Sequence, residues 1–287
     1  MPEGHSIRRL ASAFEQLFLG RRCQVSSPQG RFAAGARLLD GHVMTEVMAH
    51  GKHLFLGFGD EPLWLHIHLG LYGAWRFAGP AAGIAAIGAP RKIDPDRAMT
   101  GELVEDWQPA QPIGQVRLRL LTSDCVADVT GPNTCEVLGD ISSVLGRLGP
   151  DPLKNETGDR EIFTSAIRSS KRPVGELLLD QKIAAGVGNI FRAEALFRQG
   201  IAPGRSGEKV SQKRLNSLWD DLVLLMNRAV LNGHIVTVEP NTEAIDPESE
   251  AWYVYHRAGK PCLECNGKVA MKKVHGRTLF WCPRCQR

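Results

Sequence analysis

Residues 262–285, CLECNGKVAMKKVHGRTLFWCPRC, constrain the fold of this chain more narrowly than any other stretch. The pattern is C-x2-C-x16-C-x2-C, and its members are Cys262, Cys265, Cys282 and Cys285. Two such pairs, each on a β-turn, place four thiolates tetrahedrally around one zinc ion. The chain has seven cysteines, an odd number that argues against a disulfide framework. We therefore expect one structural zinc, with a β-hairpin over residues 274–281 between the two pairs.

The segment around these cysteines is basic. Residues 253–287 hold eight Lys and Arg against one acidic residue, Glu264, whereas the whole chain has a net charge of +4. Such a surface can be merely solubilising, but a compact basic module also captures phosphates. Arg277 lies at the tip of the expected hairpin, where its guanidinium would suit a phosphate. An ordinary exposed arginine explains this residue equally well.

A helix, a glycine-rich turn and a second helix are predicted upstream, in PVGELLLDQKIAAGVGNIFRAEALF at residues 173–197. Gly186 and Gly188 allow a ligand to approach the backbone closely, and Asn189 stands where the second helix begins. The free N–H groups of a helix N-terminus bind phosphate readily. A plain turn between two helices, with glycine as the cap, would have the same sequence.

The remaining pattern divides the chain between strands and helices. Apolar spacing predicts a helix over 4–19, and alternating runs predict strands between 22 and 128. From about residue 134 the pattern is helical, with helices predicted over 136–147, 159–169, 173–185, 189–199 and 211–232. The stretches 79–113 and 233–252 are predicted as loops.

These patterns together predict an α+β multidomain protein. We expect an N-terminal β-sandwich domain with a flanking helix over residues 1–130. A helical domain over 131–233 and a zinc finger over 253–287 would follow. No stretch reaches the roughly 18 apolar residues of a membrane span, and the start lacks the apolar core of a signal peptide. We therefore expect a cytoplasmic protein, associated with the nucleoid if the source is a bacterium.

The chain starts with Met1-Pro2-Glu3. An initiator methionine is normally removed before proline, which would leave Pro2 with a free secondary amine. An α-amino group has a pKa of about 7.7–8.0, against about 10.4 for a lysine, so it is neutral and nucleophilic far more often at pH 7. The carboxylate of Glu3 stands beside it and could move protons. Proline is also common as the second residue of processed proteins, so this start alone decides nothing.

Two further places in the strand region carry polar groups. Lys52 lies in a predicted turn between two strands, where a lysine is more often simply exposed to solvent. His66 and His68 alternate with apolar residues and therefore share one face of a strand. No third metal ligand accompanies them, which favours hydrogen-bonding or phosphate-binding roles.

In this order, the features resemble the formamidopyrimidine-DNA glycosylase and endonuclease VIII family of base-excision repair enzymes. The resemblance covers nearly the whole chain. It rests on PEG at 2–4, GKHLF at 51–55, HLGLYGAW at 68–75, LGPDPL at 148–153, DQKIAAGVGNIFRAEAL at 180–196 and GRTLFWCPRCQ at 276–286. The run at 180–196 resembles the helix–two-turns–helix motif of the family, and the last segment resembles its zinc finger.

The resemblance implies roles for individual residues. Pro2 would be the Schiff-base nucleophile and Glu3 the adjacent acid and base. Lys52 and Arg277 would complete the catalytic set. Lys52, Asn189 and Arg277 would hold the phosphates around an extruded nucleotide, and His68 would also bind DNA. Leu71 and Tyr72 would fill the gap in the duplex. The implied reaction is excision of an oxidised base, followed by β- and δ-elimination at the abasic site. The enzyme would be a monomer, with damaged DNA between its domains.

Three departures from the family bear on the substrate. His5 stands where many members have an acidic residue, and Gly70 stands where endonuclease VIII-like enzymes usually have Gln before the Leu-Tyr pair. The Arg-Arg-Phe-Gly loop of the formamidopyrimidine branch has no counterpart in 100–130. The Leu71-Tyr72 pair, the missing Arg-Arg-Phe-Gly loop and the lack of a glycine-rich segment in 233–252 instead favour the endonuclease VIII branch, with oxidised pyrimidines as substrates. The alternatives are a non-catalytic damaged-DNA-binding protein on the same fold and a zinc-ribbon RNA-binding protein.

Overall fold

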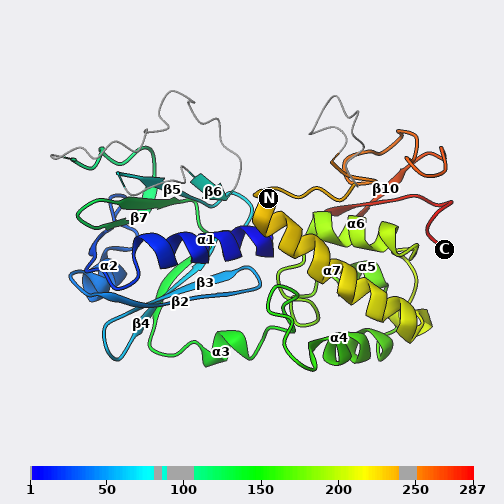
Figure 1. Cartoon of the computed structure of the whole chain (residues 1–287), viewed down its shortest axis with the longest axis horizontal. Helices are drawn as coiled ribbons and strands as arrows, with labels where there is room; N and C mark the ends of the chain where they lie inside the picture. The colour runs from blue at the N-terminus through cyan, green and yellow to red at the C-terminus, as the bar shows by residue number, and fades with distance from the viewer. Residues whose placement is uncertain (1, 81–85, 89–106, 239–250) are drawn as a thin grey trace. The chain divides into compact units, whose positions relative to one another are not determined.

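The computed structural model describes residues 2–80, 86–88, 107–238 and 251–287. The chain divides into two compact units, Met1–Leu145 and Gly146–Arg287 (Figure 1).

The first unit is a β-sandwich of two antiparallel sheets, with strand orders β1-β7-β8-β5-β6 and β2-β3-β4-β9. The strands of the first sheet are β1 (Gln24–Ser26), β5 (Ala74–Ala78), β6 (Ala86–Gly88), β7 (Val116–Leu121) and β8 (Val126–Thr130). Those of the second sheet are β2 (Met44–His50), β3 (His53–Phe58), β4 (Leu63–His68) and β9 (Thr134–Leu138). The predicted sandwich with a flanking helix is confirmed.

Helix α1 (Gly4–Leu17) supplies much of the core of this unit and lies between the strands of the two sheets in Figure 1. Its fully buried Phe14 meets Trp75 of β5 edge to face, with ring centroids 4.8 Å apart. On β3 and β4 the residues facing this core are Leu54, Leu56, Leu65 and Ile67. Because strand side chains alternate, His53, Phe55, His66 and His68 share the opposite face of the second sheet.

The structure corrects the sequence prediction at the end of this unit. The predicted helix over 136–147 is wrong in its first part, because residues 134–138 form β9 and pair with β4. Only α3 (Ser142–Leu145) is helical in that stretch. A second helix, α2 (Ala33–Leu39), lies inside the region predicted as strands. Most of the loop predicted over 79–113 lies outside the described residues, and the prediction is wrong at Ala86–Gly88, which form β6 and pair with β5.

The second unit is helical. Its elements are α4 (Asp159–Arg168), α5 (Val174–Leu177), α6 (Asn189–Arg198), a 3-10 turn η2 (Gly207–Lys209) and α7 (Gln212–Asn232). Three of the predicted helices are confirmed, including the last, which Ser211 caps by accepting a hydrogen bond from the backbone N–H of Arg214. None of the helices in the described ranges is long and apolar enough to cross a membrane.

The helix predicted over 173–185 is wrong beyond Leu177. The chain leaves the helix there because its backbone groups find partners outside it. The carbonyl of Gln181 accepts from Gly149 N at 2.8 Å, and Ala185 N donates to the carbonyl of Pro150 at 2.9 Å. The segment therefore becomes two successive turns between α5 and α6.

The zinc-finger hairpin consists of β10 (Ala270–Val274) and β11 (Arg277–Trp281), paired antiparallel. Its two-residue turn, His275-Gly276, has positive φ angles of 47° and 74°, as the tight turns that suit the twist of a hairpin require. The predicted hairpin is confirmed. Phe280, Cys262 and Cys282 join the same buried cluster as the helices of this unit, so the finger packs on the helical body.

Candidate functional site

Pro2 and Glu3 lie at the start of α1. Both are buried, and Glu3 is 0% exposed. Glu3 is the N-cap of the helix, in an extended conformation with φ −116°, and its carbonyl accepts from Ser6 N at 2.9 Å. The carboxylate makes no capping bond with the helix. The carboxyl group of Glu3, the residue that follows Pro2, is therefore not used to cap α1.

Lys52 and His68 lie at the ends of neighbouring strands. Lys52 stands in the two-residue turn Gly51-Lys52 that joins β2 to β3, and Gly51 has φ +57°. His53, next to Lys52, pairs directly with His68 at the end of β4. Burial, then the charge of Lys52 and then that of His66 lower the pKa of His68 below its usual 6.5. The strand register thus brings two predicted phosphate-binding residues to one end of the second sheet.

The turn after His68 exposes two large side chains. Leu71 is 47% exposed and Tyr72 is 76% exposed, in a turn that Gly73 N closes by donating to the Leu69 carbonyl at 3.0 Å. Gly70 has φ +66°, and a Cβ at this position would lie 2.9 Å from Cβ of Asn133. A glutamine could not replace Gly70 without strain, so the departure from the family pattern follows from the shape of this turn.

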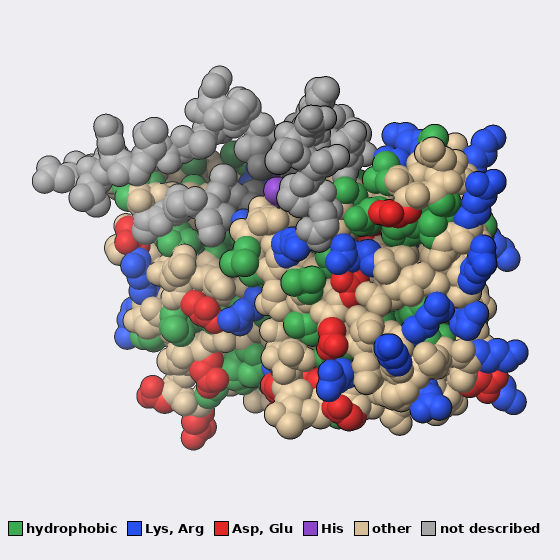
Figure 2. Space-filling model, turned by 45° about the vertical axis from the view of Figure 1, so that its right-hand side comes forward, with side chains coloured by type: hydrophobic (Ala, Val, Ile, Leu, Met, Phe, Trp, Pro, Cys, Tyr) green, Lys and Arg blue, Asp and Glu red, His purple; other side chains and the backbone are tan. Residues whose placement is uncertain are grey.

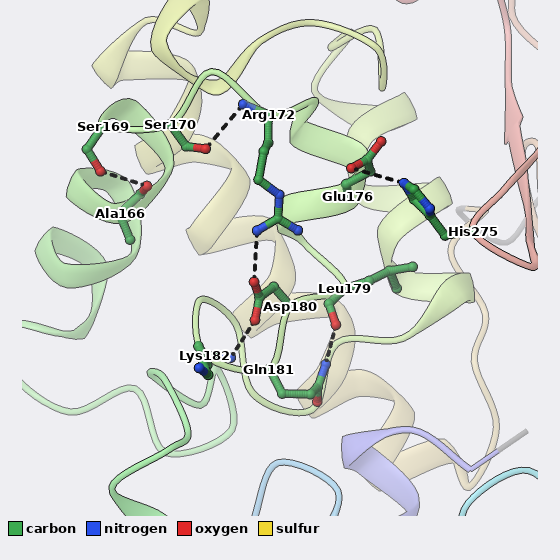
Figure 3. A network of polar contacts seen from close by, with 10 residues as sticks. All are labelled: Ala166, Ser169, Ser170, Arg172, Glu176, Leu179, Asp180, Gln181, Lys182 and His275. Atoms are coloured by element: carbon green, nitrogen blue, oxygen red, sulfur yellow. Dashed lines mark hydrogen bonds and ion pairs between the residues drawn. The ribbon is translucent and has the colours of Figure 1, made fainter.

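Asn189 begins α6, and the turn before it is held together by hydrogen bonds of the Gln181 side chain. Gln181 accepts from Gly186 N and donates to the carbonyls of Leu179 and Val187, each at 3.0 Å. In Figure 3, Arg172 reaches across to Asp180 at 3.0 Å. These contacts fix the turn before α6, and therefore the residue at which α6 begins.

Asn189 is bound to the strand that carries Arg277. Its Nδ2 donates to the carbonyl of Thr278 at 3.0 Å, and the fully buried Arg192 donates to the same carbonyl at 3.1 Å and to Oδ1 of Asn189. His275, in the hairpin turn, faces Glu176 of α5 with 3.6 Å between Nε2 and Oε2 (Figure 3). Arg277 itself is exposed. Asn189 is thus joined to the residue that follows Arg277, both directly and through Arg192, a residue that the sequence analysis missed.

Glu194 is a second residue that the sequence analysis missed. It is 0% exposed and accepts four hydrogen bonds. The donors are the hydroxyl of Thr237 at 2.5 Å and the backbone N–H groups of Tyr253, Val254 and Tyr255 at 2.8, 2.9 and 2.8 Å. Burial raises the pKa of its carboxyl group, against the lowering effect of these donors. The sequence did contain a signal for Arg192 and Glu194, because each is a charged residue among the apolar residues of α6. A charged residue in that position indicates a buried polar contact.

The four predicted zinc ligands converge. All four Sγ atoms lie within 4.8 Å of one another, with Cys262 to Cys285 at 3.8 Å and Cys265 to Cys282 at 3.5 Å. Zn–S bonds of about 2.3 Å in a tetrahedron place sulfurs about 3.8 Å apart, so the donor set fits zinc. A hydrogen bond from the Gly267 backbone lowers the pKa of the Cys265 thiol to about 7, whereas burial raises the pKa of the Cys262 and Cys285 thiols. This is a structural zinc site.

The surface of the second unit is basic. Lys and Arg side chains outnumber acidic ones toward the right-hand edge of the face in Figure 2. In the finger segment the exposed basic residues are Lys260, Lys268, Lys272, Lys273, Arg277, Arg284 and Arg287. A positive surface of this kind attracts the phosphates of a nucleic acid without regard to sequence.

Three family models match the chain in the order of its structural parts. Residues 1–127 match the formamidopyrimidine-DNA glycosylase N-terminal domain, and residues 148–240 match the H2TH domain of the same enzymes. Residues 259–287 match the zinc finger found in FPG and IleRS.

Proteins and structures of known name are similar over the whole length. Endonuclease 8 1 of Mycobacterium tuberculosis is 39% identical over 293 residues, covering 100% of both chains. DNA-(apurinic or apyrimidinic site) lyase Nei2 of Mycolicibacterium smegmatis is 29% identical over 297 residues, covering 100% of this chain and 99% of the relative. The crystal structure of MutM (FPG) from Thermus thermophilus superposes with a TM-score of 0.74 at 26% identity, covering 99% and 98% of the two chains.

Proposed function

The chain belongs to the formamidopyrimidine-DNA glycosylase and endonuclease VIII family, and we propose that Pro2 and Glu3 perform its chemistry. As a member close to endonuclease VIII, it is a bifunctional DNA glycosylase and abasic-site lyase of base-excision repair. The observation that carries the assignment of residues is the pairing of an N-terminal proline with a buried carboxyl group that does not cap its helix.

The proposed reaction starts with attack by the Pro2 nitrogen on C1′ of the damaged nucleotide. The bond between C1′ and the base breaks, and the base leaves with the proton of the amine. The bond between C1′ and O4′ then breaks, O4′ takes up a proton, and a cationic iminium between Pro2 and C1′ remains. Because the amine is secondary, this cation needs no added proton to withdraw electrons from the sugar. Loss of a proton from C2′ then expels the 3′ phosphate, and a second elimination expels the 5′ phosphate. Glu3 is proposed to move these protons.

The test is trapping with borohydride on a duplex that contains an abasic site. Borohydride reduces the iminium and leaves protein and DNA joined by a stable bond. Pro2→Gly should reduce trapping strongly while preserving DNA affinity, and Glu3→Gln should slow it. Glu15→Gln, on the same helix, serves as the matched control. Efficient trapping by protein that keeps an extra N-terminal peptide would refute the role of Pro2.

We propose that phosphates on either side of the extruded nucleotide are bound by Lys52 and His68 in the first unit and by Asn189 and Arg277 in the second. The support is geometric: each pair lies together within its own unit. Leu71 and Tyr72 are proposed to fill the space in the duplex, since large exposed apolar side chains on a tight turn suit insertion between bases.

The proposed substrates are oxidised or ring-saturated pyrimidines. A saturated pyrimidine stacks poorly, so its extrusion costs less of the few kcal/mol that flipping requires. The sequence lacks the Arg-Arg-Phe-Gly loop of the purine-directed branch. It also lacks the glycine-rich segment of that branch in the stretch from Gly233 to Trp252, and most of this stretch lies outside the described residues. Single-turnover excision of thymine glycol, dihydrouracil and 8-oxoguanine from duplex DNA tests this. Faster excision of 8-oxoguanine would overturn it.

A non-catalytic binding protein is not favoured, because the relatives are named as an endonuclease and a lyase. The monomeric state and the cytoplasmic, nucleoid-associated location expected from the sequence stay predictions.

A further inference from the structure

The second unit carries a cluster of basic side chains outside its zinc finger, and the proposed site uses none of them. They come from the end of α4 and the link to α5, from η2, and from the first turn of α7. All six are exposed: Arg168, Lys171, Arg172, Lys209, Lys213 and Arg214. We call these six residues the basic cluster.

Hydrogen bonds hold the three segments of the basic cluster together. The backbone N–H of Glu208 donates to the carbonyl of Ser170 at 2.9 Å, which joins η2 to the link after α4. Nη1 of Arg168 donates to Oε1 of Gln212 at 3.2 Å, which joins the end of α4 to the start of α7. Figure 1 shows α4 beside α7. The fold therefore gathers charges that lie more than one helix apart in the sequence.

These charges are poorly neutralised within the protein. Segments 168–172 and 205–214 hold seven Lys and Arg residues and one acidic residue, Glu208. Arg172 forms an ion pair with Asp180 at 3.0 Å (Figure 3). Within the part of the chain that the structure describes, no carboxylate forms an ion pair with the other five. Like charges gathered in this way repel one another, and a bound anion would relieve the repulsion.

Helix formation does not account for the two cations at the start of α7. The N-terminus of a helix carries a positive partial charge, so Lys213 and Arg214 in its first turn oppose the helix dipole. The cap of this helix comes from Ser211, whose side chain accepts from Arg214 N. The hydroxyl of Ser211 keeps its own proton for a further acceptor, and the residue is exposed. This turn is therefore better suited to an external anion than to the stability of α7.

The anion that matches the basic cluster repeats its charge along its length. Cations spread over three segments offer several contacts at once, whereas one small anion would use only a part of them. Duplex DNA, the substrate class of this family, carries one phosphate per 3.4 Å of each strand. Lys, Arg and Ser side chains are common donors to its phosphate oxygens, and such contacts are independent of sequence.

We propose that the basic cluster binds the phosphate backbone of a second stretch of DNA, besides the nucleotides assigned to Lys52, Asn189 and Arg277. That stretch is the flank of the damaged duplex or a neighbouring duplex, which offer the same phosphates. Such contacts hold the enzyme on undamaged DNA and leave the reacting atoms untouched. The proposal does not depend on the roles assigned to Pro2 and Glu3.

The first test measures how affinity depends on salt for duplexes of about 12 and about 30 base pairs, each with a central tetrahydrofuran abasic-site analogue. Lys213→Gln/Arg214→Gln removes two cations of the basic cluster. If the flank is bound, the slope of log affinity against log salt should fall by about 1–2 on the long duplex and stay unchanged on the short one. Arg31→Gln/Arg37→Gln, which removes two exposed charges from the first unit, is the matched control.

The second test adds a labelled undamaged duplex to a complex already formed on the short duplex. If a neighbouring duplex is bound, the wild type and the control should capture the label, and Lys213→Gln/Arg214→Gln should lose most of this capture. Urea denaturation should show no loss of stability in this variant, because the removed charges oppose the helix dipole.

Either result supports the proposal, and three results would overturn it. The first is a variant that matches the wild type in both tests. The second is an equal fall in slope on the short and long duplexes, which would assign the basic cluster to the site of the damaged nucleotide. The third is a slower single-turnover excision by the variant at saturating enzyme, which would assign these cations to the chemical step.

Discussion

Replacing Glu194 with alanine is expected to destabilise the second unit strongly. The carboxylate is fully buried and accepts from Tyr253 N, Val254 N, Tyr255 N and the Thr237 hydroxyl. Alanine offers no acceptor, so four donors lose their partner in a place that water reaches poorly. The segment they belong to leads directly into the zinc finger.

The loss in the free energy of unfolding depends on whether these four donors find other acceptors. The hydroxyl of Thr237 can turn to the carbonyl of Ala251, already 3.2 Å away, so its loss is small. The three backbone N–H groups cannot turn in this way, and each buried donor that loses its partner costs about 1–3 kcal/mol. Water entering the space left by the carboxylate offsets part of this. We expect a loss of about 3–5 kcal/mol in the free energy of unfolding.

Urea denaturation of the zinc-loaded protein measures the loss in the free energy of unfolding for the whole protein. Hydrogen exchange of the backbone amides of residues 253–255 measures the loss at this segment. Exchange there should accelerate at least about a hundredfold, since 1.4 kcal/mol corresponds to a factor of ten. Glu194→Gln keeps one acceptor oxygen and should fall between the wild type and Glu194→Ala. Glu208→Ala, an exposed carboxylate of the same unit, is the control. A loss below about 1 kcal/mol for Glu194→Ala, with unchanged exchange, would refute the reasoning.

Tyr72→Ala should slow excision from duplex DNA by about tenfold, the loss of one base-stacking contact, and excision at the wild-type rate would exclude Tyr72 from the wedge. Cys282→Ser should release zinc and weaken DNA binding, as metal analysis beside binding curves would show. Arg277→Ala should retain zinc and reduce the slope of log affinity against log salt by about 1; an unchanged slope and affinity would contradict a phosphate contact. The pKa of His68 is lowered in the folded state, so below pH 6.5 the unfolded protein binds a proton that the folded protein does not. The free energy of unfolding should therefore decrease as the pH falls below 6.5. In urea titrations, His68→Gln should lose less free energy of unfolding between about pH 8 and about pH 5, and equal losses would be evidence against a neutral, half-buried His68.

The elements that the sequence predicted well are those whose own pattern determines them. Helix α7 has a capping serine, an apolar stripe and a closing glycine within its own residues, and the finger has its cysteine spacing. Strand β9 is different. Its residues Thr134–Leu138 are mostly half-buried and show no clear alternation, so their extended form depends on pairing with β4. A local pattern cannot contain that information.

The same limit applies to the functional residues. The four cysteines and the start of the chain were visible as patterns, and the structure brings the cysteines together. The hydrogen-bonded side chains of Glu136, His66 and His53 lie on three strands, and the first two are 70 positions apart in the sequence. Arg192 binds a carbonyl 86 residues away. Such partners become neighbours only when strand register and helix packing are known.

The contact of Asn189 and Arg192 with the Thr278 carbonyl has a consequence for the kinetics of DNA binding. Two groups that can hold phosphates, one on a helix and one on a metal-bound hairpin, are fixed to each other before any DNA arrives. Ordering these groups costs conformational entropy, and this cost arises when the protein folds. It therefore does not weaken the later association with DNA. Weakening this contact while keeping zinc, as in Arg192→Met, should therefore shorten the lifetime of the complex even though neither phosphate-binding side chain has changed.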